Sequence, residues 1–285
     1  MTVILCADYE DRPKPAADVW HWQEYSSWST VVRELLADFI DDAVVEEIRA
    51  CGKEPDDLNL DDVSWLSETI DSVHGVWLDI AEELVFKLLN HYVAVRACHA
   101  TRAHTESFYE SGIRLPDPTV DVAELIRIFG RVGIPEAEVR WALEQNQSKG
   151  SAGLIYFEAK ESLLVGDAPH YAIYGSEHLL SIASHLGFEG RRALRHPARG
   201  GPTIFVCDVP IEMIGVGTIR SMAREAITLV CCEILGDEEP FVGISSPCIQ
   251  EPLPPEHIVG HYHPESLYDI HEQVMRYFDS TGVET

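Results

Sequence analysis

Hydrophobic residues recur at three- and four-residue intervals through the first third of the chain. From Ser29 to Ala50 this spacing predicts a helix with one buried face, and Gly52 is a suitable C-terminal stop. Two more helices are predicted over residues 61–74 and 77–89. The tryptophans of this region are expected to pack the helices together, with an aromatic cage for a ligand as the alternative. These tryptophans are Trp20, Trp22, Trp28, Trp65 and Trp77.

Beyond Asn90 the pattern changes to short runs of branched residues that alternate with helical segments. The predicted strands cover residues 92–98, 154–157 and 203–209. The predicted helices cover residues 105–110, 120–129, 135–145, 177–186, 221–235 and 267–278, and residues 248–259 form a proline-rich extended passage. We therefore predict an α+β protein, in which a helical region over residues 1–90 precedes a mixed α/β domain with a small, split β-sheet over residues 91–285.

Charge distinguishes these two regions. The chain carries 48 acidic and 21 basic residues, which gives a formal net charge of −27. Residues 1–90 hold 21 of the acidic and 6 of the basic residues, so this region alone contributes −15. Such a surface repels phosphate backbones and anionic lipids, which argues against general nucleic-acid binding and against docking on a membrane. It suits a protein partner with a basic surface, although solubility alone is the simpler explanation.

No targeting or membrane segment is predicted. The opening residues 1–15 have too short an apolar stretch and too many acids for a signal peptide, and no later segment reaches the ~20 apolar residues of a membrane helix. The seven cysteines are scattered without a C-x-x-C pair, which is typical of reduced thiols. We therefore expect a cytoplasmic protein.

Two segments carry the most informative side chains. In Cys98–Ile113, His99 and Thr101 lie two residues apart, so both point to one face if the segment is a strand, and a short helix follows. In residues 153–162, Tyr156 lies where a predicted strand meets a loop. Taken singly, each pattern is also typical of a strand end whose histidine or tyrosine belongs to the core.

Together these segments resemble the first two motifs of the ADP-ribosyltransferase fold. In that family a strand carries His-x-Thr or His-x-Ser and leads into a helix of the form E-S-I-L-x-x-G-L, and a second motif has the form G-x-x-Y-F-(S/A). His99–Thr101, Glu106–Ile113 and Gly153–Ala159 are similar to these, in the same order, and the resemblance covers roughly residues 90–265. It implies an NAD-dependent ADP-ribosyltransferase, or another NAD-cleaving enzyme, that acts on an unknown acceptor.

The resemblance also assigns roles to single residues. His99 would bind the adenosine-side ribose of NAD, with Thr101 beside it, and Tyr156 would stack on the nicotinamide ring. Because NAD is an anion, an acidic enzyme needs local positive charge or a helix start at the phosphates. Arg102 and Ser176, the latter placed like an N-cap, are therefore candidates, with ordinary capping as the alternative for Ser176.

The third motif of the family supplies an acid that stabilises the positive charge developing on the ribose as nicotinamide leaves. Glu251 is the preferred candidate for this catalytic acid, and Gln250 is the next. Glu256 follows the prolines and can instead anchor the chain. If the acid belongs farther upstream, the sequence offers only Ser245 and Ser246, which would remove the expected carboxylate.

Other chemistry is less well supported. His261 and His263 alternate as a metal site requires, but no further ligand follows in register, so no metal is predicted. The segment over residues 190–202 holds four arginines, which suit a phosphate or a partner, or simply a solvated loop. No P-loop, G-x-G-x-x-G or G-x-S-x-G occurs, which argues against the usual nucleotide and serine hydrolases. The alternative to an enzyme is a non-catalytic acidic interaction, inhibitor or immunity-type protein.

Overall fold

The computed structural model describes residues 6, 12–59, 62–115, 122–146, 153–237 and 246–285. Within them the chain is an α+β protein, as predicted, with twelve α-helices and three small sheets. It divides into two compact units, which we call the helical unit (Pro15–Arg96 and Val209–Pro247) and the α+β unit (Met1–Lys14, Ala97–Asp208 and Cys248–Thr285). No helix among the described residues is long and apolar enough to cross a membrane.

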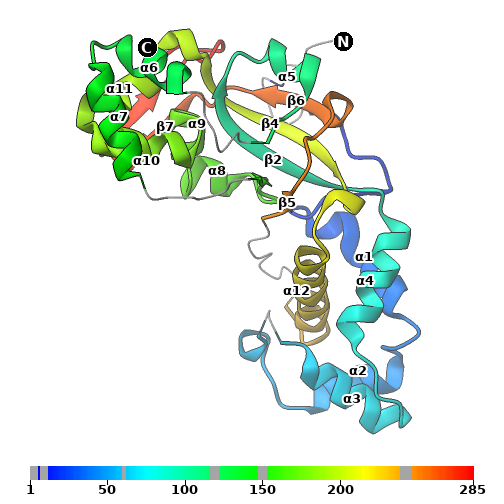
Figure 1. The fold of residues 1–285 in the computed structure, drawn as a ribbon. Coiled ribbons are helices and arrows are strands. Elements are labelled where there is room, and N and C mark those ends of the chain that lie inside the picture. The colour runs from blue at the N-terminus through cyan, green and yellow to red at the C-terminus, as the bar shows by residue number, and fades with distance from the viewer. Residues whose placement is uncertain (1–5, 7–11, 60–61, 116–121, 147–152, 238–245) are drawn as a thin grey trace. The chain divides into compact units, whose positions relative to one another are not determined.

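The helical unit draws its helices from two distant parts of the chain. They are α1 (Tyr25–Leu36), α2 (Asp42–Ala50), α3 (Ser64–His74), α4 (Ile80–His91) and α12 (Val216–Ile234), with the 3-10 turns η2 (Pro55–Asp57) and η4 (Ile211–Met213). Helix α12 contacts α1, α2 and α4 (Figure 1). The predicted division at residue 90 had assigned this helix to the second domain, whereas its buried apolar face packs on the N-terminal helices.

The single helix predicted over residues 29–50 is two helices. The side chain of Asp41 accepts hydrogen bonds from the backbone N–H groups of Ala43 and Val44, both at 3.1 Å, and so starts α2 as an N-cap. The tryptophans predicted to pack these helices are not all buried. Trp20, in β1 (Val19–Trp20), is fully buried with Trp22 and Trp28, whereas Trp77 is 67% exposed and does not join the core.

Three sheets belong wholly or partly to the α+β unit. The largest has the order β1-β2-β4-β6, with β2 (Ala94–Ala103), β4 (Gly201–Pro210) and β6 (Ile258–Tyr262). Strand β1 is parallel to β2, and β4 is antiparallel to β6. The two smaller sheets are antiparallel pairs, β3 (Ile155–Tyr156) with β5 (Cys248–Ile249) and β7 (Ser266–Asp269) with β8 (Val274–Tyr277). The sheet is therefore small and split, as predicted.

Helices cover the central strands of the α+β unit. They are α5 (Glu106–Ser111), α6 (Val122–Gly130), α7 (Glu136–Gln145), α8 (Ser162–Gly166), α9 (His170–Tyr174), α10 (Glu177–His185) and α11 (Gly187–Leu194), with η3 (Pro197–Arg199) and η5 (Pro255–His257). Ala100 of β2 and Ile204 of β4 share one core with α6, α7, α9, α10 and α11. Strand residues alternate in direction, so His99, Thr101 and Phe205 face the other way. On that side Phe108 of α5 stacks on Phe205, with ring centroids 4.6 Å apart.

The prediction of a C-terminal helix over residues 267–278 is wrong. The segment is the β7–β8 hairpin, in which Tyr268 pairs with Met275 and Asp269 with Val274. The side chain of Asp269 accepts hydrogen bonds from the backbone N–H groups of His271 and Glu272, which fixes the turn. Gln273 adopts a left-handed φ of 55°, a conformation that no helix interior contains.

Candidate functional site

The structure brings the first two sequence motifs into direct contact. Nδ1 of His99 lies 2.9 Å from the backbone oxygen of Tyr156, and the His99 ring is 5.6 Å from the ring of Phe157. The backbones of Cys98 and Glu158 exchange two hydrogen bonds of 2.8 Å, so the second motif lies along an edge of β2. The side chain of Tyr156 points out, and the residue is 46% exposed.

The contact with Tyr156 determines the tautomer of His99. A carbonyl oxygen only accepts hydrogen bonds, so Nδ1 of His99 carries the proton and donates the hydrogen bond. In the neutral ring Nε2 is then a hydrogen-bond acceptor. Burial lowers the pKa of His99, although the Tyr156 carbonyl acts in the opposite direction. His99 is therefore suited to accept a hydrogen bond from a hydroxyl group, as a ribose offers, rather than to bind a phosphate as a cation.

The third-motif candidate follows a strand that pairs with the second motif. Tyr156 of β3 lies opposite Cys248 of β5, and Ile155 lies opposite Ile249. Glu251 comes two residues after this pairing ends, is exposed, and forms no hydrogen bond or ion pair with the residues that the structure describes. The segment that holds Glu251 is thus joined to the strand that holds Tyr156, while Ser245 lies outside the described residues.

The hydroxyl groups of Thr101 and Ser176 both have partners within the chain. Thr101 is 9% exposed and donates its hydroxyl hydrogen to the carbonyl of Gly175 at 3.1 Å. Ser176 accepts a hydrogen bond from the backbone N–H of Leu179 at 3.2 Å and is therefore the N-cap of α10. Because Gly175 precedes Ser176, these contacts bring the start of α10 next to Thr101, which lies two residues, or ~7 Å, along β2 from His99.

Arg102 lies on the opposite face of β2 from His99 and Thr101. It is 6% exposed, and its guanidinium donates to the carbonyl of Ile173 at 3.3 Å. Arg199 donates to the carbonyls of Tyr174, at 2.9 Å, and Leu194, at 2.7 Å. Two guanidinium groups therefore surround the end of α9, immediately before the helix start at Ser176.

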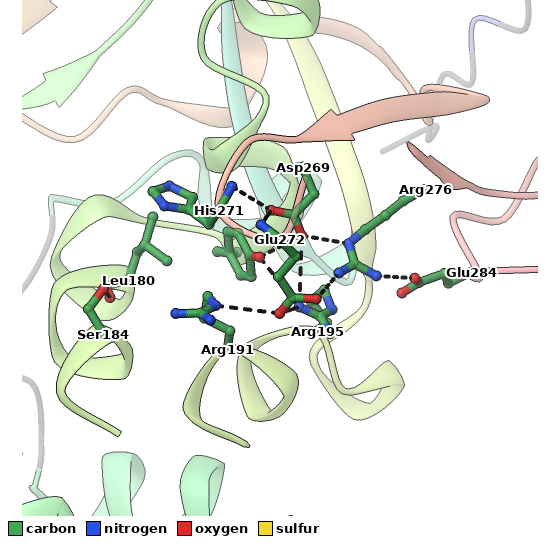
Figure 2. A network of polar contacts seen from close by, with 10 residues as sticks. Leu180, Ser184, Arg191, Arg195, Asp269, His271, Glu272, Arg276 and Glu284 are labelled. Carbon is green, nitrogen blue, oxygen red and sulfur yellow. Dashed lines mark hydrogen bonds and ion pairs between the residues drawn. The ribbon is translucent and has the colours of Figure 1, made fainter. Parts of the chain in front are cut away.

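Most of the basic segment over residues 190–202 is neutralised within the chain. Arg195 donates to the Glu272 carboxylate at 2.6 Å, and Arg191 does so at 3.4 Å (Figure 2). Arg192 pairs with Glu189 on the surface of its own helix at 2.9 Å. Arg199 is the exception in this segment, because its hydrogen bonds go to backbone carbonyls. A solvated basic loop was one expectation for the segment; helix α11 occupies its first half instead.

The carboxylates that neutralise this segment come from the β7–β8 hairpin. Asp269 is fully buried, accepts a hydrogen bond from the Tyr174 hydroxyl at 2.6 Å and pairs with Arg276 at 2.7 Å. Arg276 also binds Glu272, and it binds Glu284 at 2.5 Å (Figure 2). The network has three carboxylates and three guanidiniums, so its charges balance, and it attaches the hairpin to α9 and α11.

A second ion pair lies beside the second motif. The guanidinium of Arg12 binds both carboxylate oxygens of Glu161 and lies over the ring of Tyr262, 4.6 Å from its centroid. The Tyr262 hydroxyl donates to the same carboxylate. Glu161 thus anchors the chain just after the Gly153–Ala159 motif, a position that keeps β3 next to β2.

The paired histidines belong to other contacts. Nδ1 of His261 lies 2.9 Å from the hydroxyl of Tyr109, and Nδ1 of His263 lies 2.8 Å from the carbonyl of Pro202. The two rings are 5.3 Å apart. Among the described residues no group of three or more histidine, cysteine or acidic side chains could hold a metal ion.

Sequence reasoning missed several charged residues of this region. Asp269, Glu272 and Arg276 fall in the segment predicted as a helix, where their spacing resembled ordinary surface charge. No signal in the sequence indicated the hairpin, because Asp followed three residues later by Glu is also typical of a helix start. Arg131, at the end of α6, had no sequence signal.

Comparison of the chain with protein-family models, with curated proteins and with solved structures found no match.

Proposed function

We propose that the chain is an NAD-dependent ADP-ribosyltransferase, or another enzyme that cleaves NAD. The observation that carries this proposal is the contact between Nδ1 of His99 and the backbone of Tyr156, because it joins two motifs that are 57 residues apart in the sequence. In this proposal NAD is the substrate. Nε2 of His99 accepts from a ribose hydroxyl, and the exposed ring of Tyr156 offers a flat face to the nicotinamide.

Glu251 is the proposed catalytic acid. Nicotinamide leaves from a ribose carbon on which positive charge develops, and a fixed carboxylate stabilises that charge. The exposed position of Glu251 after β5, the partner strand of β3, supports this assignment. Thr101, Arg102 and Ser176 are proposed to contribute at the ribose and phosphate end of NAD, and the acceptor of the ADP-ribose is not specified by the proposal.

The test is release of nicotinamide from labelled NAD by the purified chain. We expect wild type to release nicotinamide, His99→Ala and Tyr156→Ala to lose most of this activity, and Tyr277→Ala to keep it. Tyr277 is the matched control because it is another exposed tyrosine, at 57%, outside the three motifs. A wild-type protein that neither releases nicotinamide nor binds NAD would contradict the proposal.

A non-catalytic role as an acidic interaction protein is the second candidate. Among its described residues the helical unit exposes two aromatic side chains, Trp77 at 67% and Phe86 at 68%, in a region rich in acids. Aromatic residues with surrounding charge are typical of protein interfaces. For this candidate we propose a protein partner with a basic surface, and capture of such a partner should fall as salt is added.

The remaining proposals concern where and with what the chain works. A net charge of −27 supports the absence of general nucleic-acid binding. Most of the seven cysteines are buried, which supports a reducing compartment, and we propose the cytoplasm. Measuring the retention of the chain on a DNA column at low salt tests the first proposal, and fractionation of cells that express the chain tests the second.

A further inference from the structure

Three buried or half-buried guanidinium groups of the α+β unit have no carboxylate partner among the described residues. They belong to Arg102, Arg131 and Arg199. Arg102 and Arg199 bond only to the backbone carbonyls of Ile173, Tyr174 and Leu194, which are neutral acceptors. In a chain with a net charge of −27, this local surplus of positive charge requires an explanation.

Part of this hydrogen-bonding capacity is buried and unused. Nε of Arg102 and Nη1 of Arg131 are both buried and have no hydrogen-bond partner among the described residues, and Arg102 as a whole is 6% exposed. Both hydrogen bonds of Arg199 leave from Nη1, so its Nε and Nη2 still have hydrogens to donate. A buried charged donor without a partner is costly, and an anion would remove that cost.

Arg199 interacts electrostatically with each of the other two groups. Burial lowers the pKa of Arg102 to about 10, and repulsion from Arg199 adds to the effect. Burial likewise lowers the pKa of Arg199 to about 10, with Glu124 opposing the shift and Arg131 adding to it. Glu124 does not neutralise the group, because its carboxylate already binds Arg127 through two hydrogen bonds.

The other charges that face Arg102 are already paired. Arg195, Arg276 and Glu284 act on it from the hairpin network, in which guanidiniums and carboxylates balance. Gly175 packs closely against both Arg102 and Arg199. A Cβ at this position would lie 3.0 Å from Nη2 of Arg199 and 3.4 Å from Cβ of Arg102, and its φ of 98° also favours glycine.

We propose that Arg102, Arg131 and Arg199 form a binding site for a phosphate group. Guanidinium is the side-chain group best matched to a phosphate, since its planar set of donors binds two oxygens at once. The amide-rich start of α10 at Ser176 follows Gly175 directly and adds favourable backbone dipoles. The phosphate belongs either to a free phosphate ion or to a bound nucleotide. In the second case the site rests on the proposed function and deepens it, because Arg102 and Ser176 are also the residues proposed for the phosphate end of NAD. The site itself needs neither His99 nor Tyr156.

The test is thermal unfolding of the full chain in inorganic phosphate, with chloride at equal ionic strength as the reference. We expect phosphate at about 100 times its Kd to raise the Tm of wild type by roughly 5–10 °C. Arg192→Gln, which removes an exposed arginine paired with Glu189, should keep the full shift, and Arg199→Gln should lose it. An equal rise in Tm in all three proteins, or no rise in wild type, would overturn the proposed phosphate site.

A second variant and a second ligand complete the experiment. Arg131 is only half-buried, so Arg131→Gln should fold even if Arg199→Gln does not. Its Tm should rise less in phosphate than that of wild type. A full rise in Tm for Arg131→Gln would overturn the proposal. His99→Ala should keep the phosphate shift, because His99 is not part of this site. A wild-type protein that shows the phosphate shift but neither cleaves nor binds NAD would refute the proposed function alone and leave the phosphate site standing. If NAD and phosphate compete for binding, the site holds a phosphate of the nucleotide. If they bind independently, the site holds a free phosphate ion.

Discussion

The imidazole of His99 is held by a single backbone carbonyl, and this defines how the ring can act. Because burial lowers its pKa, His99 should be neutral through the physiological range, with its proton on Nδ1. We expect nitrogen NMR of labelled protein to show this tautomer and a titration midpoint below the ordinary value of 6.5. A midpoint at or above that value, or a proton on Nε2, would contradict the role of Nε2 as an acceptor.

The exposed ring of Tyr156 should contribute through its face rather than its hydroxyl. Stacking of a base on an aromatic side chain contributes about 1–3 kcal/mol, so Tyr156→Ala should weaken NAD binding roughly 5- to 150-fold. Tyr156→Phe keeps the ring and should bind NAD nearly as well as wild type. Calorimetric titration of NAD into both variants checks this, and equal losses in the two would show that the hydroxyl matters instead.

Glu251 and Glu256 form a matched pair for locating the catalytic acid. Both are exposed and only five residues apart, but Glu251 lies two residues after the end of β5 whereas Glu256 lies within η5. Replacing the carboxylate that stabilises the transition state should lower the rate by roughly 100-fold with little change in binding. We expect this of Glu251→Gln and not of Glu256→Gln, measured as kcat and KM for nicotinamide release. The reverse result would move the acid to Glu256.

The sequence names candidate residues for the site but does not give their partners. His99 and Tyr156 could be named because short motifs surround them, but the bond between Nδ1 and the Tyr156 carbonyl depends on an edge pairing 57 residues away. Arg131 could not be identified, since its unpaired Nη1 arises only where α6 packs on the rest of the unit. Local pattern gives residue types, whereas tertiary contacts give their partners.

At the scale of elements, the β7–β8 hairpin depends on one buried carboxylate. Removing one partner of a buried charge network is strongly destabilising, by about 3–5 kcal/mol. We therefore expect Asp269→Asn to lower the free energy of unfolding by an amount in that range, measured by urea denaturation. Glu189→Gln, which breaks the exposed pair with Arg192, should change it by about 1 kcal/mol or less. Similar effects in both variants would show that the network is not a stabilising element.

The same carboxylate predicts a response to acid. Burial alone would raise the pKa of Asp269, but hydrogen bonds from Tyr174 and Arg276 outweigh it and keep the pKa below its ordinary value of 3.8. A lowered pKa means that the stabilisation is complete above the unfolded value and is lost as pH falls through the folded one. We expect wild type to lose stability below about pH 4 more steeply than Asp269→Asn. Parallel pH profiles of Tm for the two proteins would exclude this contribution.

The elements that the sequence predicted wrongly share a physical cause. Periodicity favours a helix over residues 267–278, but Asp269 binds two backbone N–H groups of the turn and buries its charge against Arg276, which only the hairpin permits. Periodicity also continues past Asp41, whose side chain nevertheless starts a new helix. In both places a polar side chain that bonds to the backbone outweighs a hydrophobic pattern.

For the whole molecule, the net charge of −27 should weaken the folded state at low ionic strength. Salt screens repulsion between surface charges, and the Debye length falls from about 30 Å at 0.01 M to about 8 Å at 0.15 M. We expect the Tm in sodium chloride to rise over this range by several degrees, followed by circular dichroism. A Tm that falls instead would mean that the chain's ion pairs outweigh its repulsion.

The origin of α12 has a consequence for how the protein is made. During synthesis the segment that holds α1 to α4 leaves the ribosome more than a hundred residues before α12, the helix against which α1, α2 and α4 pack. Until then the faces of α1, α2 and α4 that pack on α12 have no final partner, and contacts that span such a distance in sequence form slowly. Helices α1 to α4 should therefore remain incompletely packed on the nascent chain and become protease-resistant only after residue 234 has emerged, so that chaperones have time to bind them.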